Sequence, residues 1–269
     1  MGYKLIALDI DGTIRSQEHP LSDRTRTALQ RVREAGALVT VVTGRMFQSA
    51  LAATEGLNLV TPIVTFQGAH VADPVSRRVL WHLPLTTEMA RDALASLTSW
   101  EREVLAYHGD SVYVSRLTPW VEGYSQRNNG QVQLVPDLLD VAPRGLTRLV
   151  VVGEDADIAR LNTRLNASFA ARLQVTRSLP QFCEILHPEA GKKRALAWLA
   201  GHLGVQASDV AAFGNGAEDL PMLQWAGLGV GMSGSAPEVI AGVALVALPL
   251  KEDGVARVLE DMLEKGMIG

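Results

Sequence analysis

Short runs of apolar residues alternate with helix-like patterns in the first part of the chain. Residues 5–8 are apolar at every position, as expected of a strand that is buried on both faces of a sheet. A helix with one apolar face follows, with Ser22 placed as its N-cap and Gly36 placed to end it. Two more apolar runs, 38–42 and 63–66, predict further strands. This order predicts a parallel sheet covered by helices on both faces.

The pattern changes after about residue 83 and returns to its first form after Gly191. Between these points, short alternating segments separated by turn signals predict an antiparallel sheet packed on helices. The predicted strands there are 103–107, 111–114, 146–152, 173–176 and 182–186, and the predicted helices are 87–99 and 156–169. We therefore predict an α/β fold with a Rossmann-like parallel-sheet core. The core comprises residues 1–83 and 184–269, and an α+β domain is inserted at 84–183.

Composition narrows the class of protein. Of the 269 residues 47% are apolar, and the formal net charge is −4, so the chain lacks the basic excess of a nucleic-acid-binding domain. The single cysteine, Cys183, excludes an internal disulfide framework and a cysteine-rich zinc module. No window of 18 uncharged apolar residues and no signal-peptide core is present. We expect a cytoplasmic protein without a membrane or nucleic-acid partner.

Asp9 and Asp11 directly follow the first predicted strand. Residues two apart along an extended segment lie on the same side, and Gly12 allows the chain to turn its backbone N–H groups towards a ligand. Ligands of α/β sheets bind at the carboxyl ends of the strands. Two carboxylates so close together repel each other and require a cation or a shared proton. A simple turn that ends the strand is the alternative interpretation.

Like the segment after the first strand, two other junctions between predicted elements carry functional side chains, here of types that could bind an anion. Thr43, Gly44 and Arg45 follow the second predicted strand and provide a hydroxyl, an open backbone and a guanidinium. Lys192 begins a predicted helix, although lysine is favoured at the opposite end of the helix dipole, so an anion would offset its charge. For Thr43 to Arg45, the alternative is an ordinary strand–helix junction. For Lys192, the alternative is a solvated basic surface.

A fourth junction follows the predicted strand 210–213 and offers oxygen atoms suited to Mg²⁺. Asn215, Glu218 and Asp219 supply amide and carboxylate oxygens, but these residues also suit the capped start of a helix. Further along, the glycines of 229–234 match G-x-G-x-x-G. Too little chain follows them for a dinucleotide-binding unit, so we predict a tight loop beside the site.

The order of the four junctions resembles that of the haloacid dehalogenase superfamily of phosphotransferases. Within it, the chain resembles the Cof-type sugar-phosphate phosphatases, which insert an α+β cap between the second and third motifs. The resemblance covers nearly the whole chain, including residues 226–232 and 252–255. It implies a Mg²⁺-dependent phosphatase whose partner is a small phosphorylated metabolite, with sugar phosphates as the expected class.

The resemblance also assigns roles. Asp9 matches the nucleophile that becomes an aspartyl phosphate, and Asp11 matches the general acid that later acts as a base. Thr43 and Lys192, with Gly44 beside them, match the residues that hold the phosphoryl oxygens.

A magnesium ion is implied as well. The residues expected to bind it are Asp9, Asp11 (through its backbone carbonyl), Asn215 and Asp219. Arg45, Gln67 and Glu218 are candidates for contact with the substrate or for support of the ligating residues.

The chain departs from the family pattern in ways that affect the metal. The fourth motif usually reads Gly-Asp-x-x-Asn-Asp, whereas here Asn215 replaces the first aspartate and Glu218 replaces the asparagine. A neutral amide should weaken the affinity for Mg²⁺ unless Glu218 or Asp219 compensates. Gln67 stands where the family often has asparagine.

The sequence is also compatible with two other functions. A phosphohexomutase would use a similar core but would exclude water from the aspartyl phosphate. A phosphosugar sensor with little catalysis is suggested by Asn215 and Glu218. A dehalogenase is disfavoured because its chemistry does not need the acid at Asp11.

Overall fold

The computed structural model describes residues 2–128 and 131–269. The chain forms two compact units. The first unit comprises Met1–Arg45, Ala50–Leu80 and Gly191–Gly269, and the second comprises Met46–Ser49 and Trp81–Ala190.

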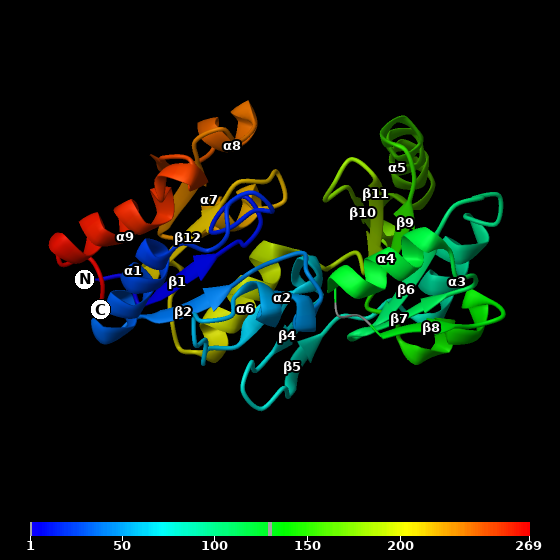
Figure 1. Ribbon diagram of the computed structural model, residues 1–269, viewed down its shortest axis with the longest axis horizontal. Coiled ribbons are helices and arrows are strands. Elements are labelled where there is room, and N and C mark those ends of the chain that lie inside the picture. Colours follow the sequence, from blue (N-terminus) through cyan, green and yellow to red (C-terminus); the bar gives the residue numbers. More distant parts are fainter. Residues whose placement is uncertain (1, 129–130) are drawn as a thin grey trace. The chain divides into compact units, whose positions relative to one another are not determined.

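The first unit is built on a parallel five-stranded sheet in the order β14-β13-β12-β1-β2. Figure 1 labels β12, β1 and β2 of this sheet. Its strands are β1 (Leu5–Leu8), β2 (Leu38–Val41), β12 (Val210–Gly214), β13 (Leu228–Met232) and β14 (Leu245–Ala247). Leu8 lies opposite Val41 on one side and opposite Phe213 on the other. The three strand ends are therefore level, and the residues that follow them share one edge of the sheet.

Helices flank this sheet in the first unit (Figure 1). They are α1 (Asp23–Glu34), α6 (Lys192–His202), α7 (Leu220–Trp225), α8 (Pro237–Ala241) and α9 (Gly254–Glu264). Ser22 caps α1 as predicted, because its side chain accepts a hydrogen bond from the backbone N–H of Thr25. The helix whose start was considered at 215–219 is α7, and it begins only at Leu220, because residues 216–219 form a turn.

The glycines of 229–234 do not form the predicted loop. Gly229 and Gly231 lie inside β13, and only the last glycine, Gly234, follows the strand. A Cβ atom on Gly229 would lie 2.2 Å from the backbone oxygen of Leu223 in α7. Glycine is needed here because the helix and the strand pack backbone against backbone.

The third predicted strand does not join the five-stranded sheet as a full member. β3 (Ile63–Thr65) forms a separate three-stranded sheet with β4 (His70–Ala72) and β5 (Val79–His82). The sequence pattern did not predict β4 and β5. It touches the main sheet through one parallel bridge between Val64 and Val42. Helix α2 (Phe47–Ala53), also not predicted, precedes β3.

The second unit is a six-stranded sheet in the order β10-β11-β9-β6-β7-β8. The strands are β6 (Val104–His108), β7 (Ser111–Val114), β8 (Gln131–Leu134), β9 (Arg148–Val152), β10 (Gln174–Thr176) and β11 (Phe182–Leu186). The predicted antiparallel pairing holds except at β7 and β8, which are parallel. Helix α4 (Pro119–Asn128), which was not predicted, connects these two strands, as a parallel pair requires a crossover.

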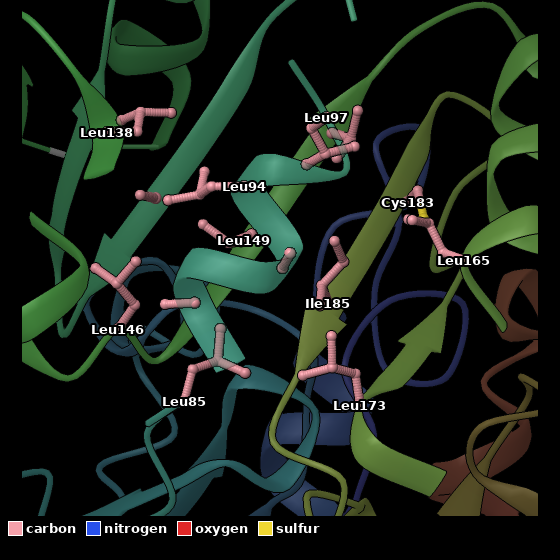
Figure 2. Close-up of a cluster of buried hydrophobic side chains, with 14 of the residues drawn as sticks. Leu85, Leu94, Leu97, Leu138, Leu146, Leu149, Leu165, Leu173, Cys183 and Ile185 are labelled. Atoms are coloured by element: carbon pink, nitrogen blue, oxygen red, sulfur yellow. The ribbon is translucent and has the colours of Figure 1, made fainter. Parts of the chain in front are cut away.

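One face of this sheet carries the hydrophobic core of the second unit. Helices α3 (Thr87–Ala95) and α5 (Asp155–Phe169) contribute Leu94 and Leu165, which pack with Leu149 and Ile185 of the strands (Figure 2). Arg148 lies on the opposite face and forms an ion pair with Glu184 at 2.9 Å; both side chains are buried.

The bounds of the second unit differ from the predicted insertion at 84–183. β11 pairs with β9 along its length, so residues up to Ala190 group with the second unit. Within the described residues, every helix falls short of the length and apolar character that a membrane-crossing helix needs.

Candidate active site

The site begins where β1 ends. The backbone N–H of Asp9 donates to the carbonyl of Phe213 at 2.9 Å, so Asp9 continues the pairing of β1 with β12. The backbone N–H of Val42 likewise donates to the carbonyl of Leu8. The carboxylate of Asp9 is therefore held at the carboxyl edge of the sheet, and the residue is only 5% exposed.

The turn after Asp9 brings the segment that follows β1 against Asn215, in the segment that follows β12. Gly12 has φ of +86°, and a Cβ atom there would lie 2.4 Å from the side-chain nitrogen of Asn215. The hydroxyl of Thr13 lies 3.2 Å from Oδ2 of Asp9 and 2.9 Å from Oδ1 of Asn215. Thr13 thus bridges two candidate residues, a role that its place in the Asp-x-Asp-Gly-Thr segment could have suggested.

Lys192 links two buried carboxylates. Its Nζ donates to Oδ1 of Asp9 at 2.7 Å and to Oδ1 of Asp219 at 2.6 Å. Burial and the negative charge of Asp219 raise the pKa of Asp9 to about 7, against the opposing effect of Lys192. Burial lowers the pKa of Lys192, but the negative charges of Asp219, Asp9 and Glu218 outweigh burial and raise this pKa above its usual value. Lys192 is therefore a fixed positive charge beside Asp9.

Asp219 has protein partners on both of its carboxylate oxygens. Oδ1 binds Lys192, and Oδ2 accepts the backbone N–H groups of Asn215 and Gly216 at 3.0 and 2.9 Å. The residue is 1% exposed. Asp219 therefore holds the turn after β12 in shape and fixes Lys192.

The side-chain amide of Asn215 lies against two oxygen atoms, the backbone carbonyl oxygen of Asp11 and Oδ2 of Asp9. With the amide oriented to satisfy its hydrogen bonds, its nitrogen donates to these oxygens at 2.8 Å and 3.2 Å. If the amide rotates, its oxygen takes this position and three oxygens converge. With the oxygen inward, the spacing is close to the edge of an octahedron of oxygen ligands around Mg²⁺, which is about 3 Å.

These oxygens fit Mg²⁺ in chemistry as well as in spacing, because a carboxylate, a carbonyl and an amide oxygen are hard ligands. In residues 2–128 and 131–269, this site included, no three His, Cys, Asp or Glu side chains are grouped so that they could hold a metal ion, so a cation here would depend on the carbonyl and amide oxygens as well.

The segment that follows β2 contacts the site through Arg45. Its guanidinium forms two hydrogen bonds with the carboxylate of Asp11, both of 2.7 Å. The hydroxyl of the buried Thr43 accepts the backbone N–H of Arg45 at 3.2 Å. The loop after β2 is thus tied to the loop after β1, and Thr43 lies at the carboxyl edge beside them.

Gln67 lies in a strained turn against this loop. Phe66, Gln67 and Gly68 all have positive φ, which is costly for the two residues with side chains. The backbone N–H of Gln67 donates to the carbonyl of Thr43, and a Cβ atom on Gly44 would lie 2.4 Å from Nε2 of Gln67. Its Oε1 is buried with no hydrogen-bond partner among the described residues.

Glu218 lies in the turn 216–219, and its carboxylate folds back over Gly216. A Cβ atom on Gly216 would lie 2.5 to 2.6 Å from the carboxylate atoms of Glu218. The candidate residues therefore form one connected set in the first unit. Asp9, Lys192, Asp219 and Asn215 make direct contacts, Asp11 pairs with Arg45, and Thr43, Gly44, Gln67 and Glu218 adjoin them.

Comparison with known proteins places this chain in a class. A family model described as haloacid dehalogenase-like hydrolase matches residues 6–259. The chain is 29% identical to an HMP-PP phosphatase of Enterobacter sp. (strain 638) over 88% of its length and 87% of that protein. It is 28% identical to the 5-amino-6-(5-phospho-D-ribitylamino)uracil phosphatase YitU of Bacillus subtilis over 96% of both chains.

A solved structure is also similar. A haloacid dehalogenase-like hydrolase from Bacteroides thetaiotaomicron superimposes with a TM-score of 0.86 at 25% identity, over 97% of this chain and 99% of that one. The chain belongs to the haloacid dehalogenase-like hydrolase family. Within the family, it is an enzyme of the phosphatase type.

Proposed function

We propose that this protein is a Mg²⁺-dependent phosphatase that hydrolyses phosphate monoesters of small metabolites, sugar phosphates among them, through an aspartyl phosphate on Asp9. The observation that carries the proposal is the contact of Asp9 with Lys192 at the carboxyl edge of the sheet, 2.7 Å apart and buried. A buried carboxylate oxygen beside a fixed cation suits attack on an anionic phosphoryl group.

In the first step, a carboxylate oxygen of Asp9 attacks phosphorus, and the bond between phosphorus and the ester oxygen breaks. Asp11 gives a proton to the departing oxygen, so that an alcohol leaves. Lys192 and Thr43 hold the phosphoryl oxygens while charge moves between the two ends of the reacting group. Asp11 lies two residues from Asp9 and is 51% exposed in its side chain, so it is open to a substrate.

In the second step, Asp11 takes a proton from a water molecule, which attacks the phosphorus of the aspartyl phosphate. The bond between phosphorus and Asp9 breaks, the carboxylate is restored, and inorganic phosphate leaves. Arg45 must release Asp11 before the first step, so that Asp11 can carry the proton it gives to the alcohol, because a carboxylate bound through both oxygens to a guanidinium is a poor proton carrier. We propose that the phosphate of the substrate competes for Arg45.

Magnesium would be held by the carboxylate of Asp9, the carbonyl of Asp11 and the amide oxygen of Asn215, whose converging positions support this assignment. When bound, it neutralises charge on the phosphoryl group and on the attacking carboxylate. Asp219 is better placed to hold Lys192 and the turn than to bind the ion, because both of its oxygens have partners.

The proposed substrate class rests on the relatives. Their names describe a phosphatase for HMP-PP and a phosphatase for a 5-phospho-D-ribitylamino uracil, both small phosphorylated molecules. The resemblance to Cof-type enzymes supports sugar phosphates as the first compounds to test.

The test is release of inorganic phosphate from p-nitrophenyl phosphate, with Mg²⁺ and with EDTA, followed by a panel of sugar phosphates. We expect Asp9→Asn to reduce release to background, because an amide is a poor nucleophile. Asp261→Asn, the same substitution at an exposed position of α9, should retain full activity. Equal activity of Asp9→Asn and the wild type would refute the proposal. Interconversion of hexose phosphates without release of phosphate would instead identify a mutase.

A further inference from the structure

The outer edge of the five-stranded sheet exposes apolar side chains at β14. Leu245, Val246 and Leu248 are 40%, 42% and 46% exposed. β14 is the end strand of its sheet, and residues 243–248 contain neither a charged residue nor a proline. Natural sheets protect their end strands with such residues or with a covering segment, because an open edge pairs with other chains. The opposite end strand, β2, is followed by a bridge to β3.

The backbone of Val246 faces away from the sheet. The carbonyl of Ala247 accepts the N–H of Ser233 at 2.8 Å, so the polar backbone groups of Ala247 face the side of β13. Successive residues of a strand turn these groups to opposite sides, and those of Val246 therefore point outward. In an antiparallel pair, two residues directly opposite each other exchange both of their N–H to carbonyl hydrogen bonds. A two-fold axis at Val246 would join two copies of this chain in that way.

A groove of about 460 Å³ lies between β14 and α9. Its lining includes Val246 of the strand and Val258 of the helix. Arg257, Asp261 and Lys265 of α9 also line it and are exposed. The open edge is therefore an apolar strip bordered by charges of both signs, which is the composition of an interface with a polar rim.

The level of α9 relative to β14 follows from the start of the helix. A Cβ atom on Gly254, the first residue of α9, would lie 1.8 Å from the carbonyl oxygen of Leu248. The chain reverses between the strand and the helix, so α9 runs back along β14. The distance from Leu248 back to Val246 is about 7 Å, which corresponds to about four to five helical residues. Val258 is therefore level with Val246.

An axis at this level makes the charges of α9 complementary between two copies. It places both copies of α9 on the same face of the joined sheet, in opposite directions. Arg257 lies one residue before Val258 and Asp261 lies three residues after it, so Arg257 of one copy and Asp261 of its partner differ in level by only about 3 Å. The same pair forms a second time across the axis. Opposite charges at these positions favour this register.

We propose that the edge of β14 is a self-association surface, on which a second copy of this chain pairs antiparallel through Val246 and each Arg257 meets Asp261 of the partner. The contact is small, and we expect a weak dimer with a dissociation constant of about 1–100 µM. At the nanomolar concentrations of an activity assay, the copies are separate. The inference is independent of the proposed function.

Sedimentation velocity tests the pairing through β14. The wild type, Val246→Lys and Val75→Lys are compared from about 1 to 200 µM, a range that spans the expected dissociation constant. Lysine on an end strand opposes pairing, so Val246→Lys should raise the dissociation constant by about 10-fold or more. Val75→Lys makes the same substitution at a valine that is 70% exposed elsewhere, and it should associate as the wild type does. Thermal unfolding of each variant verifies its fold.

Charge reversal tests the register. Arg257→Glu and Asp261→Lys each place like charges opposite each other twice in a dimer, so each variant alone should associate about 10-fold more weakly or worse. In a 1:1 mixture of the two variants, opposite charges meet at both places, and association should return to that of the wild type. Arg91→Glu, on the exposed face of α3, makes the same change in net charge and serves as the control.

Three results would overturn the inference. The first is wild-type protein that sediments as a monomer over the whole concentration range. The second is a dimer that Val246→Lys leaves as stable as before. The third is a mixture of the two charge variants that associates no better than either variant alone, because the two-fold register requires these charges to meet.

Discussion

The contact between Lys192 and Asp219 should make a large contribution to stability, which a double-mutant cycle can isolate. The two side chains are 2% and 1% exposed, with 2.6 Å between Nζ and Oδ1. Two unit charges at this distance attract each other by about 6 kcal/mol at an effective dielectric constant of about 20. The cost of burying both charges offsets more than half of this. We therefore expect a coupling free energy of about 2–3 kcal/mol.

The cycle uses Lys192→Met, Asp219→Asn and the double variant, unfolded in urea with EDTA at pH 7 and followed by circular dichroism. Lys192→Met leaves Asp9 and Asp219 buried without their cation and should lower the free energy of unfolding by about 3–5 kcal/mol. Asp219→Asn should cost less, about 2 kcal/mol, because Lys192 keeps its bond to Asp9. The double variant should lose clearly less than the two single losses combined.

The exposed pair Lys265–Asp261 in the last turn of α9 is the matched control. Its N–O distance is similar, 2.7 Å, but the side chains are 61% and 56% exposed, so its coupling should be close to zero. If the losses at Lys192 and Asp219 simply add to within about 0.5 kcal/mol, the argument that burial makes this ion pair cooperative is wrong.

Two further predictions concern buried groups. Burial raises the pKa of the Cys183 thiol to about 12, so at pH 8 the folded protein has about 1,000-fold less thiolate than an ordinary cysteine. Alkylation by iodoacetamide should be correspondingly slow in buffer, should rise tenfold per pH unit, and should be fast in urea; rapid labelling at pH 8 in buffer would contradict this. Gln67→Met should raise the free energy of unfolding by about 1 kcal/mol, because it removes a buried oxygen without a partner; a lower urea midpoint would show that the oxygen is satisfied in solution.

The sequence determines the parts of the fold that depend on local pattern. The uniformly apolar β1 forms as predicted, and Ser22 begins α1, because strand burial and helix capping are set by neighbouring residues. The sequence also identifies Asp9 and Lys192 as candidates, because Asp9 directly follows an apolar run and Lys192 begins a predicted helix. Their contact across 183 residues is a property of the sheet register.

Other features follow only from tertiary packing. The glycines of 229–234 match a dinucleotide-binding motif, but Gly229 is needed because α7 packs directly on the strand backbone. The hairpin of β4 and β5 and the parallel pairing of β7 with β8 depend on which strand is the neighbour, and local pattern does not specify neighbours.

The division of roles among the acidic residues is also decided by the tertiary structure. In the sequence, Asn215, Glu218 and Asp219 are three similar oxygen donors on one short segment. In the folded chain, Asp219 binds Lys192 and two backbone N–H groups, the side-chain amide of Asn215 lies against the carbonyl of Asp11, and Glu218 folds over Gly216. Residue type sets what each side chain can bind. Which partner it meets depends on distances that arise only when strands far apart in the chain come together.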